Sequence, residues 1–165
     1  AGGSGTALTW YLQDRADRPE ETVVVARRQE SLDALRAIHD ARGTAPGALR
    51  FLVAATPAEA DAVVAAQPLG SVIVNATGMG KDRPGSPLSD AVVFPEQAVV
   101  WEFNYRGSLE FLHQAEARQA ERGLHVVDGW DYFIHGWSQV VAEVCDIDLT
   151  PERFAALSEA AYALR

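Results

Sequence analysis

Short apolar runs rich in β-branched residues alternate along the chain with longer stretches of helical periodicity. The runs are Thr22–Ala26, Leu49–Ala54, Ser71–Asn75, Ala98–Phe103 and His125–Val127. Such runs are typical of strands that are buried on both faces of a parallel sheet. Apolar residues three and four positions apart predict helices over Gly5–Asp14, Glu30–Arg42, Pro57–Gln67 and Ser108–Arg122, from Asp128-Gly129 to about Cys145, and after Pro151. The alternation predicts an α/β fold: a doubly wound parallel sheet with helices on both faces and right-handed crossovers.

Local signals mark several helix ends. Thr56 precedes Pro57 and Thr150 precedes Pro151, so each threonine can cap a helix whose first residue is proline. Ser108 is the expected start of the fourth helix, and Gly123 is its expected end.

The composition narrows the class of protein. A chain of 165 residues fits one domain, and we treat residues 1–165 as that domain. Its net charge of -9 argues against nucleic acid as a partner, because proteins that bind the phosphate backbone carry a basic face. No apolar run reaches the ~18 residues that a membrane helix needs, so we expect no membrane partner. Cys145 is the single cysteine, which favours a reducing, cytoplasmic location, and no histidine or carboxylate pair has the spacing of a metal site.

Glycines crowd the start of the chain and run directly into a helical stretch. Glycine lets a backbone approach a phosphate, and a helix N-terminus offers free N–H groups and the positive end of the helix dipole. The segment therefore predicts the phosphate loop of a Rossmann-like dinucleotide-binding domain. Such a loop follows a strand, and no strand precedes it here. We therefore expect the first strand to be missing before Ala1, and the chain to be the C-terminal part of a longer two-domain protein.

Arg27 and Arg28 follow the run Thr22–Ala26, about 20 residues after the glycines. A domain that prefers NAD tends to place Asp or Glu there, to accept a hydrogen bond from the ribose 2′-hydroxyl. A carboxylate would repel a 2′-phosphate, whereas a guanidinium can hold it through charge-assisted hydrogen bonds. The alternative is that the two arginines only solvate a strand end. The spacing favours NADP as the cofactor.

Segments spread over almost the whole chain resemble the NADP-binding, C-terminal domain of shikimate dehydrogenases and the related quinate/shikimate enzymes. They are Gly2–Ala7, Ala26–Gln29, Asn75–Gly80, Glu102–Tyr105 and Asp128–Tyr132. In this order they are similar to the family's glycine loop, its Asn-Arg-Thr/Ser clamp on the adenosine phosphate, its Asn-Ala/Thr-Thr loop beneath the cofactor, and its Asp-x-x-Tyr and Asp-Gly-x-x-Met motifs.

The resemblance implies an NADP-dependent dehydrogenase that transfers a hydride to or from a cyclic hydroxy or keto acid such as shikimate or quinate, in aromatic amino acid biosynthesis. It implies cofactor-binding roles for Gly2, Gly3, Ser4, Gly5, Thr6, Arg27, Arg28, Asn75, Ala76, Thr77, Gly78, Met79, Gly129 and Tyr132, and substrate contacts by Tyr105 and Gln139. The family's catalytic lysine and aspartate lie on an N-terminal substrate domain. No catalytic residue is therefore expected on this chain, and that domain is an expected partner; whether the protein forms a homodimer is left open.

Three departures from the family pattern concern the substrate. Arg106-Gly107 stands where the family has Asn-Pro, Glu102 replaces aspartate, and Gly136 occupies the position of a substrate-binding glutamine. Gln139 lies about one helical turn further on. The substrate can therefore be a different cyclic hydroxy acid. A non-catalytic NADP-binding or regulatory module of the same fold is the alternative function, and an enzyme related to glutamyl-tRNA reductase is a third.

The remaining reactive side chains have ordinary expected roles. We expect His39 and His113 to be solvated on helix surfaces, His125 and His135 to be structural, Cys145 to be packed as a small hydrophobe, and Lys81 to belong to a mobile loop. An aromatic cluster of Trp130, Tyr132, Phe133 and Trp137 is expected to pack in the core or at an interface.

Overall fold

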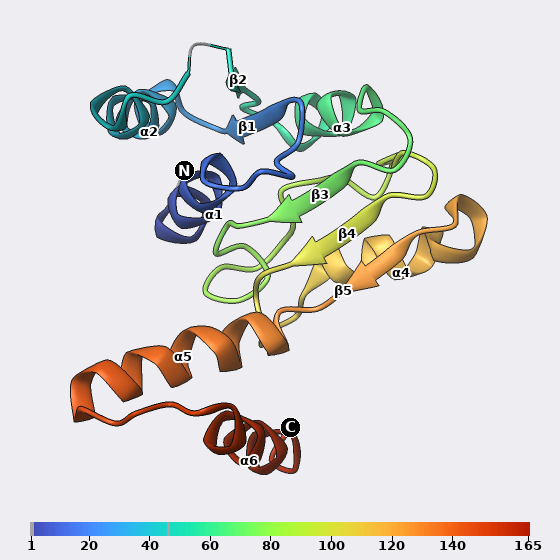
Figure 1. The fold of residues 1–165 in the computed structure, drawn as a ribbon. Helices are drawn as coiled ribbons and strands as arrows, with labels where there is room; N and C mark the ends of the chain where they lie inside the picture. Colours follow the sequence, from blue (N-terminus) through green and yellow to red (C-terminus); the bar gives the residue numbers. More distant parts are fainter. Residues whose placement is uncertain (1, 46) are drawn as a thin grey trace.

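A computed structural model describes residues 2–45 and 47–165, which form a mixed α/β structure (Figure 1). The strands are β1 (Thr22–Ala26), β2 (Leu49–Val53), β3 (Val72–Asn75), β4 (Val99–Glu102) and β5 (His125–Val127). The helices are α1 (Gly3–Gln13), α2 (Gln29–Arg42), α3 (Pro57–Ala65), α4 (Glu110–Arg122), α5 (Trp130–Cys145) and α6 (Pro151–Tyr162). Every predicted strand and helix is present, and the strand bounds differ from the predicted runs by one residue at most at each end.

The strands form two small parallel sheets. β1 pairs with β2 from Thr22 opposite Leu49 to Ala26 opposite Val53. The second sheet has the order β3-β4-β5, with Val99 of β4 between its partners in β3 and β5. Parallel pairing with helical crossovers is confirmed, but no ladder joins β1 to β3 within the described residues. One continuous doubly wound sheet is therefore not what the structure shows.

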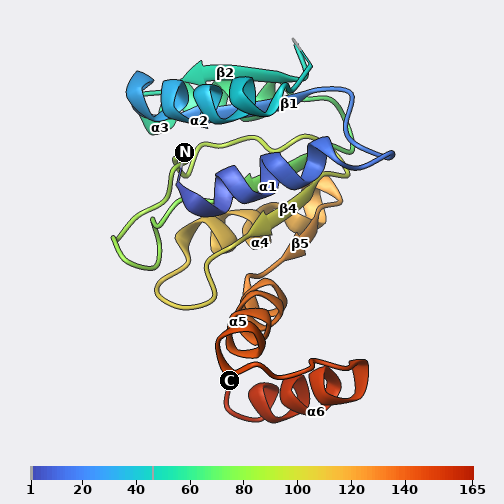
Figure 2. The ribbon, with the colours of Figure 1, turned by 60° about the vertical axis from the view of Figure 1, so that its left-hand side comes forward.

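Helices lie on both sides of the strands. Figure 2 shows α1 and α2 on one side and α3 and α4 on the other. α3 begins as the sequence predicts, because the Thr56 hydroxyl accepts from Glu59 N at 3.3 Å and the Glu59 carboxylate accepts from Thr56 N. α4 begins later than predicted: Leu109, in a left-handed conformation, precedes its first residue, so Ser108 lies outside the helix. Gly123 ends α4 at φ +63°, as predicted.

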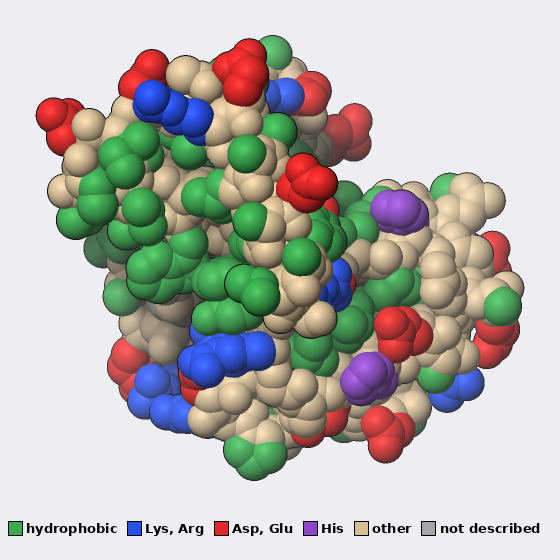
Figure 3. All heavy atoms as spheres, turned by 90° about the horizontal axis from the view of Figure 1, so that it is seen from below, with side chains coloured by type: hydrophobic (Ala, Val, Ile, Leu, Met, Phe, Trp, Pro, Cys, Tyr) green, Lys and Arg blue, Asp and Glu red, His purple; other side chains and the backbone are tan. Residues whose placement is uncertain are grey.

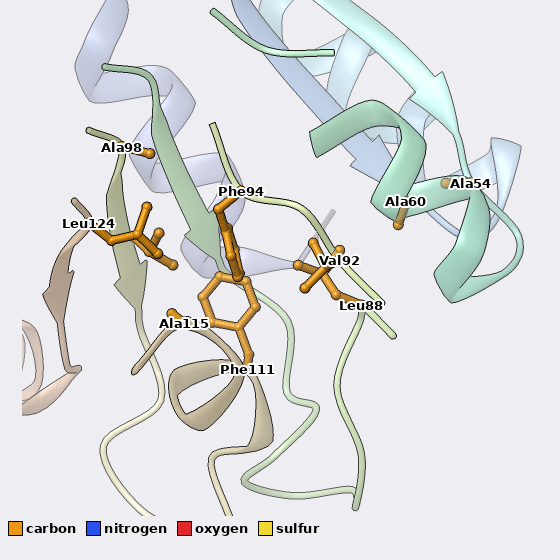
Figure 4. Close-up of a cluster of buried hydrophobic side chains, with 10 residues drawn as sticks. Ala54, Ala60, Leu88, Val92, Phe94, Ala98, Phe111, Ala115 and Leu124 are labelled. Carbon is orange, nitrogen blue, oxygen red and sulfur yellow. The ribbon is translucent and has the colours of Figure 1, made fainter. Parts of the chain in front are cut away.

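The core lies beside the three-stranded sheet. Phe94 and Phe111 meet edge to face, with ring centroids 6.2 Å apart, and both are fully buried. Figure 4 shows them among smaller apolar side chains that include Ala60 of α3, Ala115 of α4, and Leu88 and Val92 of the segment before β4. The cluster comprises Ala54, Ala60, Leu88, Val92, Phe94, Ala98, Val100, Phe111, Ala115 and Leu124. A smaller cluster of Val24, Leu32 and Leu35 joins α2 to β1. The larger cluster therefore extends from the three-stranded sheet to the end of β2 and to α3 through Ala54 and Ala60, while the smaller cluster belongs to the two-stranded sheet.

α5 and α6 form a helical pair at one end of the molecule (Figure 1). The His135 ring stacks on Phe154 with centroids 4.4 Å apart, and Trp130 contacts Tyr162. Apolar side chains of α5 stay exposed; they are Trp137, Val140, Val141 and Val144. Figure 3, which looks onto this side, shows hydrophobic side chains gathered at the surface. None of the helices in the described part of the chain is long and apolar enough to cross a membrane.

Two side chains differ from their expected surroundings. His39 was expected to be solvated, but it is buried: Nε2 lies 3.0 Å from Thr9 Oγ1 and Nδ1 lies 3.0 Å from Thr44 Oγ1. The reason is that α1 packs on this part of α2. Cys145 was expected to be packed, but it is exposed, because it is the last residue of α5 and the chain turns away after it.

Candidate functional site

The carboxyl ends of the parallel strands share one edge of the molecule. The arrowheads of β1, β3, β4 and β5 point the same way, and the start of α1 lies at the same edge (Figure 1). In open α/β sheets, ligands bind at this edge. Apart from Gln139, which lies within α5, the residues proposed from the sequence lie at or after the ends of β1, β3, β4 and β5 or at the start of α1, so the topology brings their segments to one edge.

A buried polar network connects the ends of β3 and β4. The side chains of Asn75, Glu102 and Asn104 are at most 4% exposed. Asn75 Nδ2 donates to Glu102 Oε2 at 2.8 Å, and the backbone N–H of Asn104 donates to Glu102 Oε1 at 2.8 Å. Both carboxylate oxygens are therefore satisfied, which is what a buried charge requires.

The network also shapes the loop after β3. Asn75 Oδ1 accepts from the backbone N–H and the hydroxyl of Thr77, at 3.0 and 2.7 Å. Asn104 Nδ2 donates to the backbone carbonyls of Thr77 and Met79, at 3.0 and 2.9 Å. An asparagine that bonds to the chain two residues later fixes a turn. The buried asparagines thus fix the conformation of the loop from Ala76 to Met79, while Thr77 and Gly78 stay exposed to solvent.

Burial raises the pKa of Glu102 to about 7, against the opposing effect of its hydrogen bonds from Asn104 and Asn75. The carboxyl group faces two amide side chains and backbone N–H groups. Desolvation of the charged form explains the direction of the shift. Protonation of Glu102 near neutral pH would therefore remove the negative charge of the buried network that supports the loop after β3.

Two positions near this loop can hold only glycine, because other backbone atoms lie too close to leave room for a side chain. A Cβ on Gly107, which has φ +101°, would lie 2.1 Å from the carbonyl oxygen of Gly80. A Cβ on Gly129 would lie 2.4 Å from the carbonyl oxygen of Asn104 and 2.5 Å from that of Phe103. Gly129 is therefore required for packing α5 against the end of β4. Its own carbonyl accepts from Phe133 N at 2.9 Å, in the first turn of α5.

The glycine-rich segment forms the first turn of α1 rather than a separate loop. α1 begins at Gly3, two residues before its predicted start, with Gly2 as an extended N-cap. The side chain of Thr6 and its backbone N–H both bond to the carbonyl of Gly2. The N–H groups of Gly3, Ser4 and Gly5 precede any acceptor within the helix. Apart from neighbouring residues and the backbone of α1 itself, no atom lies within 4 Å of a Cβ placed on Gly2 or Gly3, so nothing else in the described chain covers that side of the two glycines.

Arg27 and Arg28 lie directly after β1, and both side chains are exposed. Neither guanidinium has an ion pair or a side-chain hydrogen bond among the described residues. Arg28 is the N-cap of α2, where the helix dipole disfavours a cation. The charge of Arg28 therefore does not stabilise α2, and both arginines are exposed at the carboxyl end of β1.

Aromatic rings line the end of β4. Tyr105 stacks on Phe133 of α5 with centroids 3.8 Å apart. Lys81 Nζ lies 5.7 Å from the centre of the Tyr105 ring, and the Arg106 guanidinium lies 5.8 Å from it. Tyr132 stacks on Phe103 at 4.2 Å and is half-buried. The expected aromatic cluster is therefore divided: Trp130, Phe133 and Trp137 are linked by ring contacts along α5, whereas Tyr132 packs on Trp101 and Phe103.

The structure does not bring Gln139 to Tyr105. Gln139 is exposed on α5, and it follows Phe133 by six residues, which places it about 120° around the helix from the face that meets Tyr105. No atom lies within 4 Å of a Cβ placed on Gly136, so the position of the family's glutamine faces open space. Tyr105 and Gln139, which were expected to contact one substrate, therefore lie on different sides of α5.

Sequence reasoning missed the roles of Asn104 and His39. Asn104 stood inside a recognised motif, yet only the structure shows that its amide supports the loop after β3. The link between His39 and Thr9 joins residues 30 apart, so no local pattern reports it.

The comparisons with known proteins give no relative. No family model matches the chain, and no curated protein or solved structure is significantly similar to it.

Proposed function

We propose that the chain is the NADP-binding domain of a dehydrogenase of the shikimate/quinate type, with a doubly wound, Rossmann-like arrangement of its strands. The observation that carries the proposal is the pair of exposed guanidinium groups of Arg27 and Arg28 at the carboxyl end of β1, without a partner among the described residues. A 2′-phosphate is the group that distinguishes NADP from NAD, and paired arginines match its charge and geometry.

The other proposed cofactor contacts lie at the same edge of the molecule, at the carboxyl ends of the strands. The open N-terminal turn of α1 offers backbone N–H groups to a pyrophosphate, as helix N-termini commonly do. The loop held by Asn75 and Asn104 presents Thr77 and Gly78 to the same side. These residues fit a dinucleotide: they supply donors to its phosphates and a rigid border to its nicotinamide half.

NADP supplies the hydride acceptor when it is bound. This chain's residues would bind and orient it. The substrate alcohol loses a hydride to the cofactor and a proton to a base, and we place that base on a separate substrate domain. Tyr105 would border the substrate, because its ring is fixed by Phe133 and faces the cations of Lys81 and Arg106. Both cations also pair with Asp82, at 3.5 and 3.9 Å, so an acidic substrate such as a cyclic hydroxy acid would share them with that carboxylate.

Substitution of Arg28 tests the cofactor assignment. Arg28→Ala should weaken NADP binding by about ten- to a hundredfold, the scale of a lost charged hydrogen bond, and leave NAD binding unchanged. Arg118→Ala on α4 is the matched control, because it removes the same charge far from this edge. Titration calorimetry of the three proteins measures the effect. Equal loss in both variants, or a wild type that does not distinguish the two cofactors, would reject the assignment.

A non-catalytic NADP-binding module is the second candidate. The separation of Gln139 from Tyr105 favours it, because the expected substrate contacts do not converge. Both functions predict NADP binding, so turnover separates them. A complete protein that binds NADP but reduces none of a panel of cyclic keto acids would support the module.

A further inference from the structure

A chain of hydrogen bonds leads from the buried carboxyl group of Glu102 to the exposed loop after β3. Asn75 Nδ2 donates to Glu102 Oε2 at 2.8 Å. On its other side, Asn75 Oδ1 accepts from the backbone N–H and the hydroxyl of Thr77, at 3.0 and 2.7 Å. Glu102 is fully buried and Asn75 is 1% exposed, whereas Thr77 is exposed. The amide group of Asn75 therefore connects a buried carboxyl group to an exposed turn.

The donors around Glu102 suit its charged form. Oε2 accepts from the Asn75 amide and Oε1 accepts from the backbone N–H of Asn104 at 2.8 Å, so each oxygen faces an N–H group. A proton on either oxygen would place an O–H against one of these donors, at the cost of a hydrogen bond. Burial nevertheless raises the pKa of Glu102 to about 7, so the charged and the protonated forms are both populated near neutral pH.

Of the two donors, the Asn75 amide is the one that can turn. The Asn104 N–H belongs to the backbone, and the Asn104 side chain ties this segment to the carbonyls of Thr77 and Met79, at 3.0 and 2.9 Å. Rotation of the Asn75 amide by half a turn exchanges its oxygen and its nitrogen. The oxygen would then accept from protonated Glu102, while the nitrogen would face the Thr77 N–H, which is itself a donor.

We propose that Asn75 is a proton-controlled switch for the loop after β3. With Glu102 charged, Asn75 accepts from the Thr77 N–H and the turn is formed. With Glu102 protonated, Asn75 turns to accept from the carboxyl O–H and releases the Thr77 N–H. Thr77 and Gly78 border the site that we assign to NADP, so the effect on binding rests on the proposed function. Glu102 and Asn75 are positioning residues of that site, which is better ordered above neutral pH than below it.

The other titratable groups around Glu102 do not replace it in this role. Among the described residues, burial and hydrogen bonds alone shift the pKa of Glu102. β3, which pairs with β4 on one side, has no titratable side chain, and β5 on the other side has the exposed His125. The first turn of α4 carries Glu110 and the exposed His113. The pKa of Glu110 is lowered, first by a hydrogen bond from Ser108, so Glu110 stays charged near neutral pH.

Nuclear magnetic resonance of residues 1–165 tests the switch without a ligand. The carboxyl carbon of Glu102 and the backbone amide of Thr77 should titrate together, with one midpoint near pH 7. Glu102→Gln should keep the Thr77 amide at its low-pH position between pH 5 and pH 8, because the glutamine amide can donate to the turned Asn75. Glu110→Gln is the matched control and should titrate like the wild type. A Thr77 amide that does not follow Glu102 in the wild type would overturn the proposal, whether or not the variants fold.

NADP binding is a separate readout. From pH 6 to pH 8 the affinity of the wild type should rise about two- to tenfold more than that of Glu102→Gln, the scale of one hydrogen bond. Both proteins share their histidines and bind the same ligand, so the titration of those groups cancels in the comparison. An equal change in the two proteins would overturn the control of the site by Glu102. A Thr77 amide that titrates with Glu102 in a chain that does not bind NADP would support the switch and reject the proposed function.

Discussion

Glu102 is a carboxyl group fully enclosed at the end of β4 and satisfied at both oxygens by amide donors. Replacing it by alanine would leave the Asn104 N–H buried without a partner and would leave Asn75 Nδ2 with only its long hydrogen bond, 3.5 Å, to the Met79 carbonyl. Each such loss costs about 1–3 kcal/mol. The loop after β3 depends on the same two asparagines, so Glu102 positions that loop without touching a ligand.

The raised pKa of Glu102 gives a stability that depends on pH. The unfolded carboxyl group loses its proton near pH 4.5 and the folded one near 7, so the folded state binds more protons between these values and stability falls as pH rises through this window. The loss amounts to at most about 3 kcal/mol. Urea unfolding at pH 5 and pH 8 should show it in the wild type.

Glu102→Gln is the control for this effect, since it cannot ionise. His39 has a lowered pKa because of its burial, so its own contribution is present above pH 6.5 and is lost as pH falls. Both proteins keep His39, and the difference between them isolates Glu102. A wild type and a Gln variant with the same change in stability between pH 5 and pH 8 would show that Glu102 is charged throughout.

Gly129 and Gly136 offer a matched pair of substitutions at and within α5. Gly129→Ala should destabilise the fold by about 2–4 kcal/mol, because its Cβ would clash with two backbone carbonyls that cannot move independently. Gly136→Ala should stabilise it by about 0.5–1 kcal/mol, because the site is open and alanine favours a helix. Thermal unfolding of both variants measures the contrast, and a Gly129→Ala protein as stable as wild type would contradict the close packing described.

Helix ends illustrate what the sequence predicts at the scale of an element. The Thr56-Pro57 and Thr150-Pro151 pairs predicted the starts of α3 and α6, because a capping hydroxyl acts on residues three positions away. The start of α4 was predicted at Ser108 and lies at Glu110, because the tight contact of Gly107 with Gly80 determines the turn. Helix starts that depend on residues a few positions away could be predicted from the sequence, whereas a helix start that depends on contact with a distant backbone segment could not.

The cap of α3 provides a prediction at this scale. Thr56→Ala removes the hydroxyl that accepts from Glu59 N, and it should cost about 1 kcal/mol of stability. Thr56→Ser keeps the acceptor and should restore most of the loss. Chemical denaturation of the three proteins is the measurement. Equal stability of the alanine and serine variants would mean that the cap does not contribute.

At the scale of the whole molecule, the sequence predicted the strands, the helices and their parallel pairing, because these depend on periodicity and crossover rules. It did not predict that the strands form two separate sheets. Of the candidate site, segments after β1, β3, β4 and β5 were placed at one edge, while the position of Gln139 was not anticipated. Its orientation depends on how α5 packs, which motif spacing does not report.

The central claim is that this edge binds NADP through its 2′-phosphate. The most direct measurement titrates NADP and NAD by calorimetry against one preparation of the chain. The account predicts NADP affinity about ten- to a hundredfold higher than that for NAD, and a difference that shrinks as salt is raised, because the discriminating contact is ionic. Equal affinities for the two cofactors, or tighter binding of NAD, would contradict it.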